Sequence, residues 1–378
     1  MSRLAETTWE RPGPGTWVHD AAHGTAPTSR VVQDLFPSAM EAGFRSATGR
    51  YGILLSHVEV RYVNGFAYGS PRIAGVGATD RPPPPGWMLW VLSRVHPEMR
   101  RRDRSARSAL RDRIWTTDLH RWFEVERPAW IDALLSLQAI DPDRLDDAEL
   151  ADHVERCATT LSDGLTLHFS FIAASSVPVG LHLVREAAKG RSSASALDDL
   201  RGAAPDSTGA TIPALRSIAE ALDRAGAVPT SLDDVRTAST DAAAALDAYL
   251  SLHGQRAVGG NDVTARRLVE MPDVILRSIA RARTVDMPAA DDDRTVDDPA
   301  DHVLADARLA LASRDDHSGI CGSWSVGLLR RALLAAGARL SASGRVPDSH
   351  SLIDCTAHET AALLRGADAP TADELAQR

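Results

Sequence analysis

The stretch DDAELADHVERCATTLSDGLTLHFSFIAA, residues 146–174, decides the fold class, because it is long and regular enough to predict one extended helix. Apolar residues recur every three or four positions in its first part, which is typical of an amphipathic helix with one face in a core. Its last turns are apolar on every side, so we expect that end to be buried. A chain built around this segment is predicted to be mainly α-helical.

Helical patterns continue on both sides of this segment. PAWIDALLSLQAI (residues 128–140) opens with a proline, which is favoured in the first helical turn. Three further helices are predicted at IPALRSIAEALDRAG (212–226), STDAAAALDAYLSLHGQ (239–255) and WSVGLLRRALLAAGARLSASGRV (324–346), the last stopping at Gly344. The arginine-rich MRRRDRSARSALRDR (99–113) is interpreted as a solvated helix face rather than a polyanion site.

The N-terminal third has a different character. In HVEVRYVNGFAYG (57–69), apolar residues alternate around Asn64-Gly65, which predicts a hairpin with a type I′ turn. Seven of the eight tryptophans precede residue 131. We expect four of them to be core residues, because aromatic side chains bury large areas: Trp87, Trp90, Trp115 and Trp122.

The expected organisation has three parts. Residues 1–115 form an aromatic-rich mixed portion with the small β element, residues 116–290 form a helical substrate-binding domain, and residues 300–378 form a C-terminal helical segment. The acidic, proline-containing ADDDRTVDDPADH (290–302) is predicted to be a linker or cap between the last two.

Composition narrows the possible functions. The formal charge of −9 over 378 residues argues against a nucleic-acid partner. Lys189 is the sole lysine and no GxxxxGK[ST] loop occurs, so self-sufficient ATP chemistry of the usual kinds is not expected in this chain. Three widely spaced cysteines, no signal segment and no long apolar run predict a cytoplasmic protein without a membrane partner.

The segment VHDAAHGTAPTSR (18–30) offers a candidate catalytic base, His23, and a candidate anion ligand, Arg30. Histidine titrates near working pH, and the arginine fork suits phosphoryl oxygens. The alternative is structural: Thr28 or Ser29 before an apolar run is a helix N-cap that needs no ligand.

Two other places supply candidate substrate-binding residues. His168 lies in the predicted buried helix. It either lines a substrate pocket or, as is more common for a lone histidine, is a hydrogen-bonded core residue. LHGQRAVGGNDVTARRLVEMP (252–272) places Arg256 and Asp262 around Gly259-Gly260, either as a structural pair that holds a turn or as an anion-facing loop. No metal site is predicted there.

SVGLLRRALLAAGARLSASGRVPDSHSLIDCTAHETAALLRG (325–366) resembles the helical segment that leads into the mobile phosphohistidine domain of phosphoenolpyruvate-utilising enzymes. HGQRAVGGNDVTARRLVEMPDVIL (253–276) is similar to a stretch of rifampicin phosphotransferase and phosphoenolpyruvate-synthase-like proteins. ERPGPGTWVHDAAHGTAPTSRVVQDLFPSAMEAGFR (10–45) also resembles members of this group. In that family such a helical region binds the acceptor, between an ATP-grasp domain and a swivelling histidine domain.

The resemblance implies the acceptor-binding component of a dikinase-like phosphotransferase, acting on a small hydroxylated or aromatic compound. ATP, Mg²⁺ and the phosphohistidine are expected on a partner domain or subunit, because neither carrier motif lies in these residues; His317 in DDHSGICG is the nearest imitation. No cofactor is therefore expected in this chain, and the chain alone is expected to be inactive. Two alternatives stay open: a non-catalytic scaffold subunit, and a lyase or dehydratase that uses the same pocket.

Overall fold

The computed structural model describes residues 8–21, 26–75, 85–200, 212–284, 299–367 and 370–377. It is 69% helical with one small antiparallel sheet, so the predicted mainly α fold is confirmed. The predicted acidic linker lies outside the described residues except for its last four, which begin a helix.

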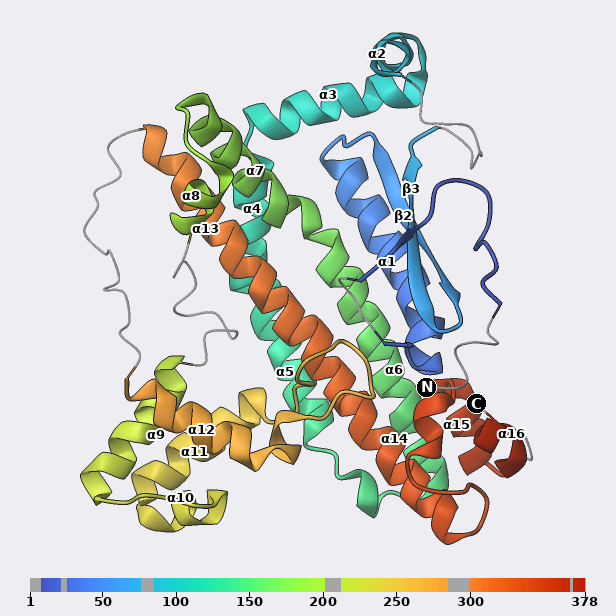
Figure 1. The fold of residues 1–378 in the computed structure, drawn as a ribbon, viewed down its shortest axis with the longest axis vertical. Coiled ribbons are helices and arrows are strands. Elements are labelled where there is room, and N and C mark those ends of the chain that lie inside the picture. The colour runs from blue at the N-terminus through green and yellow to red at the C-terminus, as the bar shows by residue number, and fades with distance from the viewer. Residues whose placement is uncertain are drawn as a thin grey trace.

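The sheet belongs to the N-terminal portion. Its strands are β1 (Val18–His19), β2 (Leu55–Val63) and β3 (Phe66–Ile73), in the order β1-β3-β2. Asn64 and Gly65 have φ of 52° and 80°, as a type I′ turn requires, so the predicted hairpin is confirmed. Helix α1 (Arg30–Arg50) lies along this sheet and packs on the central helix α6 (Asp147–Ser170) (Figure 1).

The central layer contains the longest helices. Helix α6 begins with a capping box, in which Asp146 and Glu149 each accept from the other's backbone N–H. The predicted uninterrupted helix to residue 174 is wrong in one detail, since α6 stops at Ser170 and α7 (Ile172–Ala188) follows. The break is at Phe171, whose buried ring lies 5.8 Å from the ring of Trp122 and 4.9 Å from that of His317.

The remaining helices outside the sheet complete the fold around α6 and α7. Helices α13 (Pro299–His317) and α14 (Ser325–Ala342) are joined through a π-helical turn, Ser318–Trp324. Helices α4 (Ile114–Arg121) and α5 (Arg127–Gln138) are joined through another, Trp122–Glu126. Gly344 has φ of 72° beyond α14, so the predicted stop is confirmed. The other elements are α2 (Gly86–Val95), α3 (Pro97–Arg111), α8 (Ser193–Asp198), α15 (Ala357–Leu364), α16 (Ala372–Gln377) and the 3-10 turns Pro142–Arg144, Leu268–Glu270 and Ser351–Asp354.

Four helices form a unit with its own hydrophobic core, here called the small helical unit. They are α9 (Ile212–Ala225), α10 (Leu232–Ala238), α11 (Thr240–His253) and α12 (Pro272–Ala282). Fully buried Ile218, Leu222 and Leu246 belong to this core, which is separate from the main one. The unit lies at the end of the molecule opposite α2 and α3 (Figure 1).

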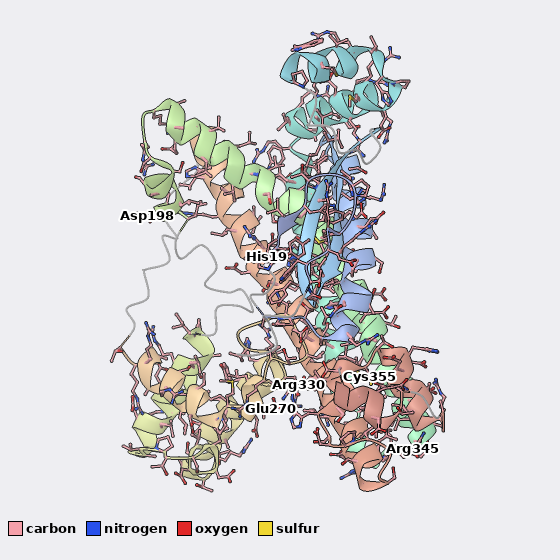
Figure 2. The ribbon with its side chains drawn as sticks, turned by 45° about the vertical axis from the view of Figure 1, so that its right-hand side comes forward. His19, Asp198, Glu270, Arg330, Arg345 and Cys355 are labelled. Carbon is pink, nitrogen blue, oxygen red and sulfur yellow. The ribbon has the colours of Figure 1, made fainter. Side chains whose placement is uncertain are left out.

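The loop between α11 and α12, residues 254–271, holds the small helical unit to α14. Gly327 of α14 permits close contact, because a Cβ there would lie 1.5 Å from the carbonyl oxygen of Gln255. Arg330 donates to the carbonyl of Val263 at 2.8 Å and to Glu270 at 3.1 Å, and Figure 2 shows its side chain beside Glu270. The loop is therefore fixed by a small residue and an arginine one turn apart on one helix.

The predicted tryptophan core is only partly correct. Trp115 and Trp122 are buried, as expected. Trp87 is 68% exposed, which contradicts its prediction as a core residue, because α2 projects beyond the main core. The side chain of Trp90 lies outside the described residues.

Among the described residues, the helical run Asp147–Ala188 is long and apolar enough to cross a bilayer by length and composition alone. Core helices of soluble proteins pass the same test. Here α6 and α7 pack against α1, α13 and α14, as core helices do.

Candidate functional site

The candidate site is a cleft of about 580 Å³ at the start of α1, here called the α1 cleft. Four segments that are far apart in the sequence line it: the α1 start (27–34), the β2–β3 turn (64–65), Thr264 of the 254–271 loop, and Asp354 with Thr356 before α15. Cys355, labelled in Figure 2, marks the last of these segments. Tertiary packing alone brings these polar groups together.

The N-terminus of α1 is capped by a distant residue. Ser29 holds the N-cap position but makes no side-chain bond to its own helix. Its backbone N–H and hydroxyl instead donate to one carboxylate oxygen of Asp262, at 2.8 and 2.9 Å. The other oxygen of Asp262 accepts from Thr264 N–H at 2.8 Å. Asp262 therefore joins α1 to the 254–271 loop and places Thr264 in the cleft wall.

A second helix also begins at the cleft. Thr356 is the N-cap of α15, and its hydroxyl accepts from Glu359 N–H at 3.1 Å while Glu359 accepts from Thr356 N–H at 2.8 Å. Helix N-termini carry partial positive charge and exposed N–H donors. The cleft thus lies between the N-termini of α1 and α15. The exposed side chain of Arg30 adds a full positive charge to its lining.

The hairpin turn is bonded to the α1 start at this cleft. Thr28 N–H donates to the carbonyl of Gly65 at 2.8 Å, and the Gln33 amide donates to the carbonyl of Thr28 at 2.7 Å. Gly65 has positive φ, and a Cβ there would lie 2.8 Å from Pro27. The tight turn predicted from Asn64-Gly65 therefore also forms part of the cleft.

Two carboxyl groups, Asp34 and Asp354, line the same cleft. A carboxylate can accept the proton of a hydroxyl that is being attacked or transferred. It also repels an anion, so the balance between these groups and Arg30 sets what the cleft can bind. The arrangement suits a ligand with both a hydroxyl and a negatively charged end.

Four of the five predicted site residues lie among the described residues, two at the cleft and two away from it. Arg30 lines the cleft and Asp262 binds its neighbour Ser29, so the structure brings these two together. Arg256 is buried and His168 is partly buried, and neither lines the cleft. His23 lies outside the described residues.

Arg256 is buried, and its guanidinium lies 5.5 Å from the Trp324 ring centre while its Nε donates to the carbonyl of Leu252 at 2.9 Å. Burial lowers the pKa of Arg256 to about 10, and the nearby carboxylate of Asp316 opposes that shift. Asp316 is itself fully buried and accepts from Arg127 at 2.7 Å. These contacts support a packing role for Arg256.

His168 lies against Phe169 and His317, with ring centres 4.9 and 6.0 Å away. His317 is buried beside Trp122 at 4.0 Å. Burial, followed by the neighbouring His168, lowers the pKa of His317 well below its usual value. The π-helical turns 122–126 and 318–324 both border this interior group.

Sequence reasoning missed Asp34, Thr264, Asp354 and Thr356. The pattern Thr356-x-x-Glu359 is a capping-box signature and predicts the start of α15. No local pattern could place that start beside α1, because the contact depends on how α1, α14 and α15 pack on α6.

A protein-family model matches the middle of the chain. Residues 172–333 match the model of the rifampicin phosphotransferase fourth domain. No curated protein matches the chain. The match extends from α7 into α14 and includes the whole 254–271 loop, so it agrees with the resemblance of residues 253–276 to rifampicin phosphotransferase.

Proposed function

We propose that this chain is the acceptor-binding component of a dikinase-like phosphotransferase, and that the α1 cleft holds the acceptor. The observation that carries the proposal is the position of two helix N-termini and Arg30 around one cleft. Such an arrangement favours phosphoryl oxygens, since backbone N–H groups and a guanidinium are their preferred partners. The match to a rifampicin phosphotransferase domain supports a phosphotransferase-type family.

In this proposal, the chain binds and orients the acceptor, and the phosphoryl group arrives on a histidine of another domain or subunit. That partner also supplies ATP and Mg²⁺. Arg30 and the N-termini of α1 and α15 stabilise negative charge on the transferred group. Asp34 or Asp354 takes the proton of the acceptor hydroxyl, and His23 remains a predicted base.

Binding of phenyl phosphate, a phosphorylated aromatic alcohol, tests the cleft without any partner. Phosphorus NMR line broadening measures its affinity for the full chain. Arg30→Gln is expected to weaken binding about tenfold, because a charge-assisted hydrogen bond contributes about 1.5 kcal/mol. Asp354→Asn is expected to tighten binding, since it removes a like charge.

Arg144→Gln is the matched control, because Arg144 is also an exposed arginine but does not line the cleft. Equal affinity of the wild type, Arg30→Gln and Arg144→Gln would refute the cleft as an anion site. A chain that binds no phosphorylated probe but still associates with a phosphohistidine-bearing protein would favour the scaffold alternative. Conversion of an acceptor alcohol by the chain alone, without ATP, would favour the lyase or dehydratase alternative.

A further inference from the structure

An exposed apolar helix face lies at the end of the molecule that is farthest from the small helical unit (Figure 1). On α2, Trp87, Val91 and Val95 recur every fourth residue, and Met88 lies beside Trp87. Their exposed fractions are 68%, 39%, 63% and 37%. Recurrence every fourth residue places the first three along one face of the helix.

A basic helix adjoins α2. On α3, which packs against α2, four exposed arginines follow a 4-3-4 spacing that places them on one stripe: Arg100, Arg104, Arg107 and Arg111. Residues 86–113 contain eight arginines and three carboxylates, a net charge of +5 in a chain whose total is −9. The rest of the chain therefore carries −14, and the α2–α3 arm (residues 86–111) is a basic end on an acidic protein.

The ion pairs on α3 leave these arginines available. Arg107 pairs with Asp103 at 3.1 Å and Arg111 with Asp112 at 2.8 Å, in both cases with strongly exposed side chains. Exposed pairs of this kind contribute little stability and are readily exchanged for another anion. The sequence-based interpretation of residues 99–113 as a solvated helix face agrees with the exposure of the α3 arginines. It does not account for the exposed apolar residues of α2.

We propose that the α2–α3 arm docks on the surface of an anionic lipid bilayer, with Trp87, Val91 and Val95 in the interface and the α3 arginines on lipid phosphates. An exposed tryptophan with aliphatic neighbours and adjacent arginines has the chemistry of an interfacial helix. A polyanion such as RNA would use the arginines but leave the apolar face in water. The −14 on the rest of the chain repels the same bilayer, so the arm alone makes contact. This proposal departs from the sequence-based expectation of no membrane partner and is independent of the α1 cleft.

Flotation of the full chain with vesicles tests it, using phosphatidylcholine alone and phosphatidylcholine with phosphatidylglycerol. We expect binding only to the anionic vesicles, with most of it lost in high salt. Trp87→Ser is expected to abolish flotation. Arg104→Gln and Arg107→Gln are each expected to weaken it about fivefold, the ~1 kcal/mol that one basic side chain contributes near an anionic surface.

Matched controls are Val228→Ser, an 87% exposed apolar residue elsewhere, and Arg144→Gln, and neither is expected to change flotation. All of these positions are exposed, so folding should be retained, and circular dichroism checks it. Absence of flotation with anionic vesicles at low salt overturns the proposal. So does a dimer in light scattering that disappears in Trp87→Ser, or tight binding of an oligonucleotide that needs the arginines but not Trp87.

Discussion

Replacing Gly327 with alanine should dislodge the 254–271 loop from α14. The added Cβ would lie 1.5 Å from the carbonyl oxygen of Gln255 and 2.8 Å from its carbonyl carbon. Ordinary contact begins near 3.4 Å, and both atoms are backbone, so the loop must move by roughly 2 Å. Overpacking costs about 1–3 kcal/mol. A shift of that size also breaks the bond from Arg330 to Val263 and the one from Ala257 to Ser323, both 2.8 Å and each contributing about 1 kcal/mol.

We therefore expect the free energy of unfolding to fall by about 3–5 kcal/mol, measured by urea denaturation with tryptophan fluorescence. Gly180→Ala is the control, because Gly180 is an exposed residue within α7 and its added Cβ would meet nothing within 4 Å. Alanine there should stabilise by about 0.5–1 kcal/mol. If both variants unfold at the same urea concentration, the close contact between α14 and the 254–271 loop does not stabilise the fold, and the prediction is refuted.

Two further predictions concern stability. Asp118→Asn should destabilise the protein by about 1–3 kcal/mol in urea denaturation, because Asp118 accepts from Arg50 at 2.8 and 2.7 Å and from the Tyr51 hydroxyl at 2.8 Å. Tyr51→Phe should cost only about 1 kcal/mol, because it removes one of these three bonds and keeps the ion pair. An equal loss of stability in both variants would contradict the dominant role of the ion pair. Burial, then nearby arginines, lowers the pKa of His153 to about 4 and that of His253 to about 3. The unfolded chain binds these protons near pH 6.5, so stability should be full above that pH and fall by about 1.4 kcal/mol per pH unit per histidine down to pH 4. A constant free energy of unfolding between pH 7 and pH 5, measured in urea, would show that these histidines are not buried as neutral groups.

Local chemistry explains which parts of the fold were predictable. Asn64-Gly65 needs no tertiary information to form its turn, and the helix that ends shortly before Gly344 is evident from periodicity and a stop residue. The break at Phe171 lies among the aromatic rings of Trp122 and His317, which come from distant parts of the sequence, so no local pattern reveals this environment. Trp87 was misplaced because a large aromatic residue is usually buried, and only the projection of α2 shows otherwise.

The candidate site was predictable only in fragments. Arg30 and Asp262 were each selected for their own chemistry, but nothing in the sequence indicated that Ser29 would connect them across 233 positions. Thr356 was absent from the prediction, because its relation to α1 depends entirely on packing.

The bond between Ser29 and Asp262 has a consequence for the order in which the protein is made. Domains generally fold from the N-terminus during synthesis, at about 5–20 residues per second. The residue that caps α1 is added 233 positions after Ser29, which corresponds to a delay of roughly 10–50 seconds. During that interval α1 can pair with the hairpin, but its first turn stays uncapped. A ribosome-bound chain that ends before residue 262 should thus carry a frayed α1 start, which is protected only after the 254–271 loop has emerged.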